Sequence, residues 1–324
     1  MTRFAEVRAA PPTPPASPAV GSPVGPAAAG PAEEPRVGWA YVAPALSIIL
    51  LVGLFPLAWT VWESLHRHDL RMPWLDRPFV GVANYAAILA DARFWGALGH
   101  TAFFAVTSIA LELVLGLFLA LALNERFRGR GLVRAAVLVP WAIPTVVAAL
   151  LWRFMFESQT GIANAVLVGA GVLDQPVVWF VRTATAWVPV ILADVWKTTP
   201  FVALLLLAGL QNIDRSLYEA AATDGASAWW QLRHITLPLL APAILVVLIF
   251  RTLDAFRVFD LIYVLTGGGP GTSTEPIAVY AFNALLQNLE FGYGAALSVV
   301  IFLVTFALAL LYIKGFGATV GGGR

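Results

Sequence analysis

Charged side chains recur inside two stretches of the chain that are otherwise apolar. In the first stretch Asp194 and Lys197 stand three residues apart, so on a helix they would share a face and could pair. In the second stretch, charges of alternating sign recur every three residues, at Arg251, Asp254, Arg257 and Asp260. A charge in hydrocarbon costs about 2.5–3.5 kcal/mol on insertion scales, so each of these side chains should face a partner or a wet cavity. The pattern indicates either a polar path through a membrane or a structural ladder of ion pairs.

The chemistry open to these groups is the binding of a polyhydroxylated solute. Sugars need carboxylates, amides or cations for their hydroxyl groups and aromatic side chains for their apolar faces. Aromatic and hydroxyl groups are supplied nearby by Trp141, Thr145 and Trp196. We assign Asp194, Lys197 and Asp254 to a translocation path. For Arg251, Arg257 and Asp260, a role in the translocation path and a role in a structural ladder of ion pairs remain equally open. Glu112 is interpreted as a buried structural carboxylate paired with another helix.

Other kinds of chemistry find no support in the sequence. The chain has no cysteine and 4 histidines, which form no metal-ligand pair, and no serine-histidine-aspartate signature occurs. The segment Gly267–Thr274 resembles a phosphate-binding loop but has no lysine before its hydroxyl residues, so we expect a tight outer turn that does not bind ATP. The sequence therefore predicts no catalytic site, no metal site and no cofactor.

Composition indicates what must position these residues. Hydrophobic residues make up 59% of the chain and charged residues 12%, which is typical of a polytopic membrane protein, and a net charge of +1 excludes a strongly basic nucleic-acid binder. A membrane-spanning helix needs roughly 20 apolar residues. Six stretches qualify: Trp39–Glu63, Leu98–Leu123, Ala135–Phe156, Thr185–Leu210, Pro238–Ile262 and Tyr293–Ile313.

Orientation follows from the basic residues, which concentrate on the cytoplasmic side. The short loop Asn124–Arg134 carries four arginines and the loop Leu261–Gly292 carries no lysine or arginine, so both termini are expected in the cytoplasm. The four arginines of Ser64–Ala97 run against this assignment. Residues 1–36 are rich in proline and alanine, without apolar periodicity, and are expected to be a disordered cytoplasmic tail.

A polar and alanine-rich segment separates the fourth and fifth stretches. Ser216 and Glu219 have the spacing of a capping box, which would begin a short helix, and Gly225 would end it. A second short helix is expected to run toward Ile235, and Pro238 fits the first turn of a new helix. Taken alone, this would be an interfacial pair of amphipathic helices.

This segment resembles the cytoplasmic coupling loop of permease subunits in binding-protein-dependent ABC importers, most closely the sugar branch typified by the maltose permease. The pattern is Glu219-Ala-Ala, then Gly225, then Ile235-x-Leu237-Pro238, and similar phrases recur from about Val42 to Gly315. In that family the loop docks into the ATP-hydrolysing subunit. The resemblance implies that coupling to the ATPase uses Glu219, Ala220, Ala221, Asp224, Gly225, Ile235, Leu237 and Pro238.

The resemblance also implies the fold and the substrate path. We expect an all-α polytopic membrane protein with the six transmembrane helices of the type I importer permease and a cytoplasmic coupling helix. Its parts are the tail 1–36, the first helix and outer loop 37–97, the core 98–315 with its coupling loop 212–237, and the tail 316–324. The family's sugar-contacting positions correspond to Trp141, Thr145, Asp194, Lys197, Thr198, Asp254, Ala255 and Val258. Several of these side chains depart from the maltose permease in type, so maltose itself does not follow.

The function that the resemblance implies is import of a sugar by a non-catalytic permease subunit in the inner membrane of a prokaryote. The implied partners are a second homologous permease, an ATPase dimer that uses ATP and Mg²⁺, and an extracytoplasmic sugar-binding protein. Phrases around Trp196 and Arg251 are similar to those of actinobacterial trehalose importers, which suggests trehalose or a maltose-like disaccharide. Glycerol-phosphate or another oligosaccharide is an alternative, and an ion-coupled secondary transporter is a third.

Overall fold

The structure, a computed structural model, describes residues 35–321, with side chains from Tyr41 to Lys314. The chain divides into two units between Phe55 and Pro56. The first unit contains α1 (Pro35–Ile49) and a π-helical turn (Leu50–Leu54). The predicted disordered tail lies outside the described residues up to position 34, and α1 begins two residues before its predicted boundary.

Helices dominate the described part of the second unit, and no strand longer than an isolated bridge occurs there. Five helices are long and apolar enough to cross a membrane, or six if one bent pair counts as a span. The unbroken spans are Tyr41–Ser64, Ala92–Asn124, Thr183–Leu210, Ala228–Ala255 and Phe291–Lys314. The predicted all-α fold is confirmed, and the six predicted stretches correspond to these five unbroken spans and the bent pair.

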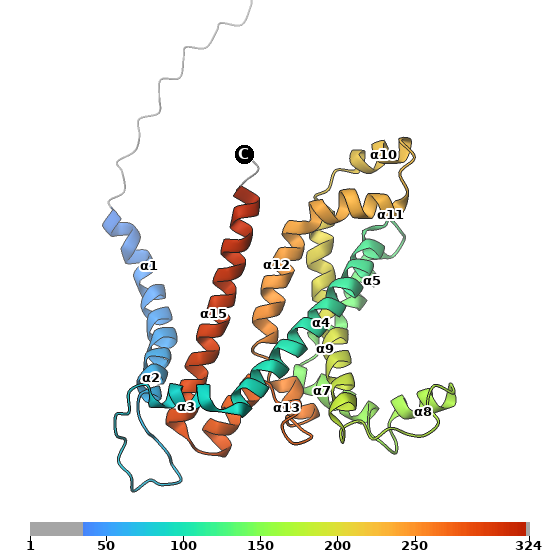
Figure 1. Cartoon of the computed structure of the whole chain (residues 1–324). Helices are drawn as coiled ribbons and strands as arrows, with labels where there is room; N and C mark the ends of the chain where they lie inside the picture. The colour runs from blue at the N-terminus through green and yellow to red at the C-terminus, as the bar shows by residue number, and fades with distance from the viewer. Residues whose placement is uncertain (1–34, 322–324) are drawn as a thin grey trace, which may run out of the picture. The chain divides into compact units, whose positions relative to one another are not determined.

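These spans and the shorter helices between them are drawn in Figure 1. The long helices are α4 (Ala92–Asn124), α9 (Thr183–Leu210), α12 (Leu237–Ala255) and α15 (Phe291–Gly321). The shorter ones are α2 (Phe55–Ser64), α3 (Ala83–Ala90), α5 (Arg130–Val137), α6 (Val139–Ala142), α7 (Thr145–Met155), α8 (Ile162–Gly169), α10 (Arg215–Thr223), α11 (Ala228–Gln231), α13 (Asp260–Leu265) and α14 (Ile277–Phe282). Within the second unit, α10 and α11 lie at one end of α4, α9 and α12, and α13 lies at the other.

The third predicted span is not a continuous helix. The segments Arg130–Ala142 and Thr145–Met155 meet at 87°, whereas the sequence predicted one helix over Ala135–Phe156. Pro144 explains the break, because a proline disfavours the helical conformation at the residue before it, and Ile143 is extended with φ −69° and ψ 132°. The apolar run was predicted and its bend was not.

The fifth span also differs from its prediction, which ran over Pro238–Ile262. Helix α12 ends at Ala255, and after a short turn the chain starts the separate helix α13 at Asp260. At its other end the helix does not begin at Pro238, because α11, a π-helical turn (Leu232–Thr236) and α12 form the single span Ala228–Ala255. The π turn lies where Pro238 has no N–H to complete an ordinary turn.

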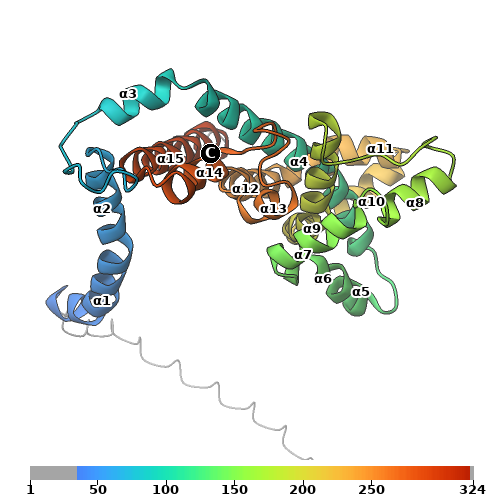
Figure 2. The same cartoon turned by 90° about the horizontal axis from the view of Figure 1, so that it is seen from below.

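The core of the second unit is built by α4, α9 and α12. Two glycines allow close approach: a Cβ on Gly116 would lie 2.7 Å from Val202 of α9, and one on Gly209 would lie 2.6 Å from Ala243 of α12. Small residues at helix contacts are how membrane helices pack, because lipid supplies no hydrophobic drive to bring them together. Figure 2 shows the same helices from below, with α14 beside α15.

The loop after α13 is a tight turn, as predicted. Gly267, Gly268 and Gly271 have positive φ, and the Thr274 N–H donates to Gly268 O at 3.0 Å. The Thr274 hydroxyl donates to Gly269 O at 2.6 Å. The next residue, Glu275, is buried and accepts two 2.8 Å hydrogen bonds from Arg93, which fastens α14 to the start of α4.

Candidate functional site

A cavity of about 300 Å³ lies among α6, α7, α9 and the end of α12. It is lined by every residue that the sequence predicted for the substrate path: Trp141, Thr145, Asp194, Lys197, Thr198, Asp254, Ala255 and Val258. Its other lining residues are Phe104, Arg251, Arg257, Phe259, Asp260 and Leu261. Residues up to 157 positions apart in the chain, from Phe104 to Leu261, therefore meet at one space.

The departures from regular helix are what shape this cavity. Trp141 and Thr145 stand on opposite sides of the 87° break between α6 and α7, so both sides of the bend contribute to the wall. Val258 belongs to the turn that interrupts the fifth span after Ala255. At Ile143 and Phe256 the helices end and the chain changes direction. Non-helical backbone within a membrane is tolerated where it lines a cavity.

Arg251 sits beside this cavity at the centre of a buried ionic cluster. Its Nε donates to Glu112 Oε2 at 2.5 Å and its Nη2 to Glu112 Oε1 at 2.7 Å. Nη2 also reaches Asp194 Oδ2 at 2.9 Å, and Nη1 reaches Asp254 Oδ2 at 2.7 Å. Arg251 is 3% exposed and Glu112 is fully buried. One guanidinium thus joins carboxylates from α4, α9 and α12, and the prediction of Glu112 as a structural carboxylate paired with another helix is confirmed.

The pairing of Asp194 with Lys197, which their spacing allows, does not form. Asp194 binds Arg251, and the Lys197 ammonium donates instead to the backbone oxygen of Trp141 at 3.2 Å. Of the predicted ladder, only the Arg251–Asp254 rung forms among the described residues. Arg257 and Asp260 form no ion pair among the described residues, because the helix that would have carried them ends at Ala255.

The three carboxylates differ in what they can still bind. Glu112 and Asp194 are buried against the guanidinium, whereas the Asp254 side chain is 64% exposed and opens into the cavity. The cavity also presents the cations Lys197 and Arg257 and the indole of Trp141, which is 49% exposed and stacks on Phe201. Such a mixture of acceptors, donors and aromatic side chains suits a neutral solute that carries many hydroxyl groups.

The predicted coupling residues lie on α10, the following turn and the start of the fifth span. The predicted capping box is wrong, because α10 begins at Arg215 and its N-cap is Asp214, whose carboxylate accepts from Ser216 N at 2.9 Å. That hydrogen bond holds the pKa of Asp214 below its usual range. Gly225 has φ +78°, as predicted. The N–H of the next residue, Ala226, donates a 2.9 Å hydrogen bond to the Ala221 oxygen and so closes the end of the helix.

Exposure differs among these coupling residues. Ala221 packs inward at 9% exposure, while Glu219, Ala220, Asp224, Gly225 and Pro238 are exposed, and Ile235 and Leu237 are half-buried. A surface of small and polar side chains therefore remains open on the outside of α10. Ser227, which the sequence did not single out, caps α11 through a 3.3 Å bond from Trp230 N.

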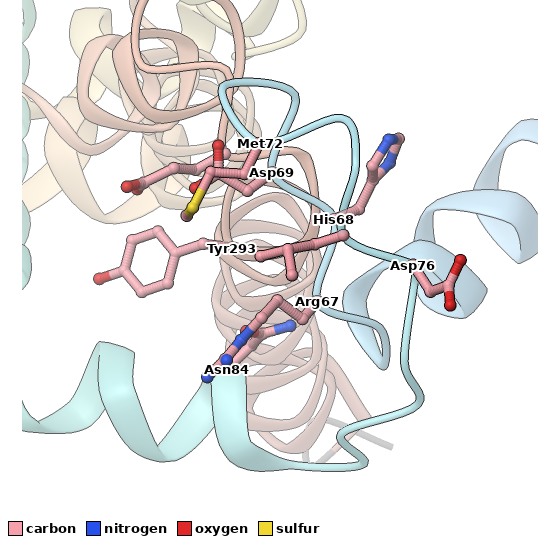
Figure 3. A pocket seen from close by; sticks show the side chains of 9 residues that line it. Arg67, His68, Asp69, Met72, Asp76, Asn84 and Tyr293 are labelled. Atoms are coloured by element: carbon pink, nitrogen blue, oxygen red, sulfur yellow. The ribbon is translucent and has the colours of Figure 1, made fainter.

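A second cavity, of about 270 Å³, lies under the loop that joins α2 to α3 (Figure 3). Arg67 and Asn84 point to the same side of it in Figure 3. Asp69 and Glu290 both bind Arg71, and this pairing lowers the pKa of Asp69. Backbone bonds from Leu70 N to Leu289 O and from Gly292 N to His68 O, at 3.0 and 3.1 Å, clamp the loop to the start of α15. The predicted outer loop is thus held in place by hydrogen bonds to the segment that begins α15.

Comparison with known proteins places these features in context. A family model described as "Binding-protein-dependent transport system inner membrane component" matches residues 112–314. The trehalose/maltose transport system permease protein MalF of Thermococcus litoralis is 46% identical over 282 residues, which cover 87% of this chain and 94% of that protein. The trehalose transport system permease protein SugA of Mycobacterium tuberculosis is 42% identical over 292 residues, covering 90% and 92%.

A solved structure has a similar fold. A chain of a bacterial ABC transporter involved in the import of the acidic polysaccharide alginate superposes with a TM-score of 0.73 at 23% identity. The match covers 86% of this chain and 94% of that one. At this level of identity the likeness concerns the arrangement of the helices.

Proposed function

The chain belongs to the family of binding-protein-dependent transport system inner membrane components, and we propose that it carries trehalose or a maltose-like disaccharide into the cytoplasm. It is a non-catalytic, multi-pass permease subunit of an ABC sugar importer, and the ATPase is a separate subunit. We infer the disaccharide from two relatives, a trehalose/maltose permease and a trehalose permease, which are 46% and 42% identical to this chain over the aligned residues.

The observation that carries this proposal is the convergence of eight sequence-predicted residues on one cavity among four helices. In our proposal the solvent-exposed carboxylate of Asp254 accepts hydrogen bonds from sugar hydroxyls. Lys197 and Arg257 donate to hydroxyl or ring oxygens, and Trp141 stacks on an apolar sugar face. Asp194 is buried against Arg251 and stabilises the wall of the site, so Asp254 and not Asp194 contacts the sugar directly.

The same proposal assigns coupling to the segment 212–237. The exposed outer side of α10, with Glu219 and Ala220, would enter a groove of the ATPase subunit, which binds ATP and Mg²⁺. A second, homologous permease would complete the path, and an extracytoplasmic binding protein would deliver the sugar. In this arrangement the core is 98–315, the first helix and outer loop are 37–97, and both termini are cytoplasmic. The predicted last tail, 316–324, overlaps α15, which continues to Gly321.

The test is uptake by the complete importer in liposomes that contain binding protein, ATPase and both permeases. Asp254→Asn keeps the shape of the side chain but removes a charged acceptor, whose loss costs about 1.5–3 kcal/mol and lowers sugar uptake roughly tenfold to a hundredfold. Asp174→Asn is the matched control, because Asp174 is an exposed carboxylate that does not line the cavity. Basal ATP hydrolysis should be unchanged in both.

The result that contradicts the proposal is wild-type uptake by Asp254→Asn for every sugar tried. A panel of trehalose, maltose, a longer oligosaccharide and glycerol phosphate identifies the substrate, and preferred uptake of glycerol phosphate would replace the disaccharide. Uptake by this chain alone under an ion gradient, without the ATPase, would favour the secondary-transporter alternative.

A further inference from the structure

A groove of about 950 Å³ lies at the end of the second unit that carries α10 and α11, on the side of α10 that faces the spans. Its walls come from the last turn of α4, from α5, from the end of α9 and from α10 and α11. The charged residues among its lining are Arg126, Arg130, Arg134, Arg215 and Glu125. Four guanidinium groups and one carboxylate leave an excess of three positive charges around one space.

The four arginines of the groove are not paired with carboxylates in the described part of the protein. None of the four takes part in an ion pair there, although other arginines do, Arg71, Arg93 and Arg251 among them. Arg134 donates from Nη2 to the Leu123 backbone oxygen at 2.9 Å, but its Nε is buried without a hydrogen-bond partner. A buried guanidinium N–H without an acceptor costs free energy, so the groove favours a ligand that supplies one.

The position of the groove indicates which ligand. Asn124 and Leu210, the last residues of two membrane-spanning helices, both line it, so the groove lies at the level where the apolar spans end. Large apolar side chains are exposed on the helices that form its walls: Trp229 on α11, which lines the groove, is 69% exposed, Leu132 on α5 is 78% exposed and Phe118 on α4 is 68% exposed. Basic groups next to exposed leucine, phenylalanine and tryptophan are typical of a membrane interface.

We propose that this groove binds the headgroup of an anionic phospholipid. Guanidinium groups donate pairs of hydrogen bonds to phosphate oxygens, and basic pockets at the cytoplasmic ends of membrane helices suit such headgroups. The exposed indole of Trp229, which lines the groove, offers an apolar contact to the acyl chains, and exposed apolar side chains on the wall helices add to it. An acidic protein segment would satisfy the arginines but would leave these apolar side chains uncovered, so the lipid is the better fit.

The arginines could instead serve only to set the orientation of the chain in the membrane, and this explanation makes a different prediction. Retention of positive charge in the cytoplasm depends on the number of arginines in the loop and not on which of them line a cavity. Arg128 separates the two explanations, because it lies in the same loop and is exposed but does not line the groove. Arg128→Gln removes the same charge as Arg130→Gln and is the matched control.

The experiment is native mass spectrometry of the full-length chain with equimolar phosphatidylglycerol and phosphatidylcholine of the same acyl length. A basic residue near the membrane surface contributes about fivefold to the binding of anionic lipid, so Arg130→Gln with Arg134→Gln should lower the phosphatidylglycerol preference roughly 25-fold. Arg128→Gln should keep it. Because Arg134 also contacts the backbone of α4, the pair Arg126→Gln with Arg215→Gln repeats the test without that contact and should give a similar loss.

Several results would overturn the proposal. One is an equal affinity of the wild-type chain for the two lipids, and another is a loss with Arg128→Gln as large as with the groove variants. Displacement of the lipid by millimolar inorganic phosphate or glycerol 3-phosphate would mean that the groove takes a free anion. Loss of the preference when the ATPase is bound would mean that a protein covers the groove. Each readout is lipid binding, so it succeeds or fails independently of sugar transport.

Discussion

Arg251 determines how the charges of the site can act. Its guanidinium binds Glu112 and Asp194, both buried, and through Nη1 also the exposed Asp254. Removal of one partner from a buried ion pair leaves an uncompensated charge, which costs about 3–5 kcal/mol. Arg251 is therefore expected to orient the Asp254 carboxylate toward the cavity and to hold α4, α9 and α12 together.

The variant Arg251→Met tests this structural role. Glu112 and Asp194 would lose their cation, and we expect a loss of stability of about 3–5 kcal/mol, seen as a lower thermal midpoint or a lost monodisperse peak in detergent. Arg257→Met is the control: Arg257 lines the same cavity but has no ion pair among the described residues. An unchanged midpoint for Arg251→Met would contradict the role assigned to the cluster.

Among the elements, the turn after α10 has the clearest conformational requirement. Gly225 has φ +78°, a conformation that costs other residues about 1–2 kcal/mol, and asparagine less than most. A Cβ added at Gly225 would meet nothing within 4 Å, so conformation and not space is what limits this position. The direction in which α11 leaves α10 therefore depends on this residue.

Gly225→Val and Gly225→Asn separate conformation from bulk. The valine variant should bind the ATPase subunit roughly 5-fold to 30-fold more weakly, the equivalent of about 1–2 kcal/mol, while the asparagine variant should stay close to wild type. Co-purification of the ATPase with the permease measures the difference. Equal recovery with both variants would mean that the turn does not set the docking geometry.

The elements also show which features a sequence can predict. Apolar length located every span, because the thickness of hydrocarbon alone sets that requirement. The bend at Ile143 was missed although Pro140 and Pro144 signal it, since both prolines sit inside an unbroken apolar run. The partner of Asp194 was missed for another reason: Lys197 is three residues away and Arg251 is 57, and only helix packing decides between them.

At the scale of the whole molecule, the ends of the spans divide by charge. The end with α5, α10 and α11 gathers Arg126, Arg128, Arg130, Arg134 and Arg215, and the loop between α13 and α14 has no basic residue. Arginines at the other end do occur, but Arg71 and Arg93 are both neutralised, by Asp69 with Glu290 and by Glu275. Because orientation follows the number of lysines and arginines and not the net charge, the four arginines of the loop Ser64–Ala97 still count against a cytoplasmic position for α10.

Single cysteines test this orientation, since the chain has none of its own. In intact cells, Thr272→Cys should react with a membrane-impermeant thiol reagent, and Phe127→Cys should react only after permeabilisation. Thr272 is preferred to Ser273, whose hydroxyl is buried, and Phe127 is 43% exposed. Labelling of Phe127→Cys in intact cells would reverse the orientation and, with it, the assignment of α10 to the ATPase.

The unbroken run from Ala228 to Ala255 has a mechanical consequence. Its first turn holds Trp229 beside α10, and its last turn holds Asp254 at the cavity that we propose for the sugar, so one helical run with a π turn at Leu232–Thr236 joins the two regions. At 1.5 Å per residue α12 alone is about 28 Å long, and a tilt of about 10° around its middle would swing each end by about 2.5 Å in opposite directions. That stroke is close to the length of a hydrogen bond, so under the proposed function a push on α11 by the ATPase could break the bond between Asp254 and a sugar hydroxyl through a tilt of α12.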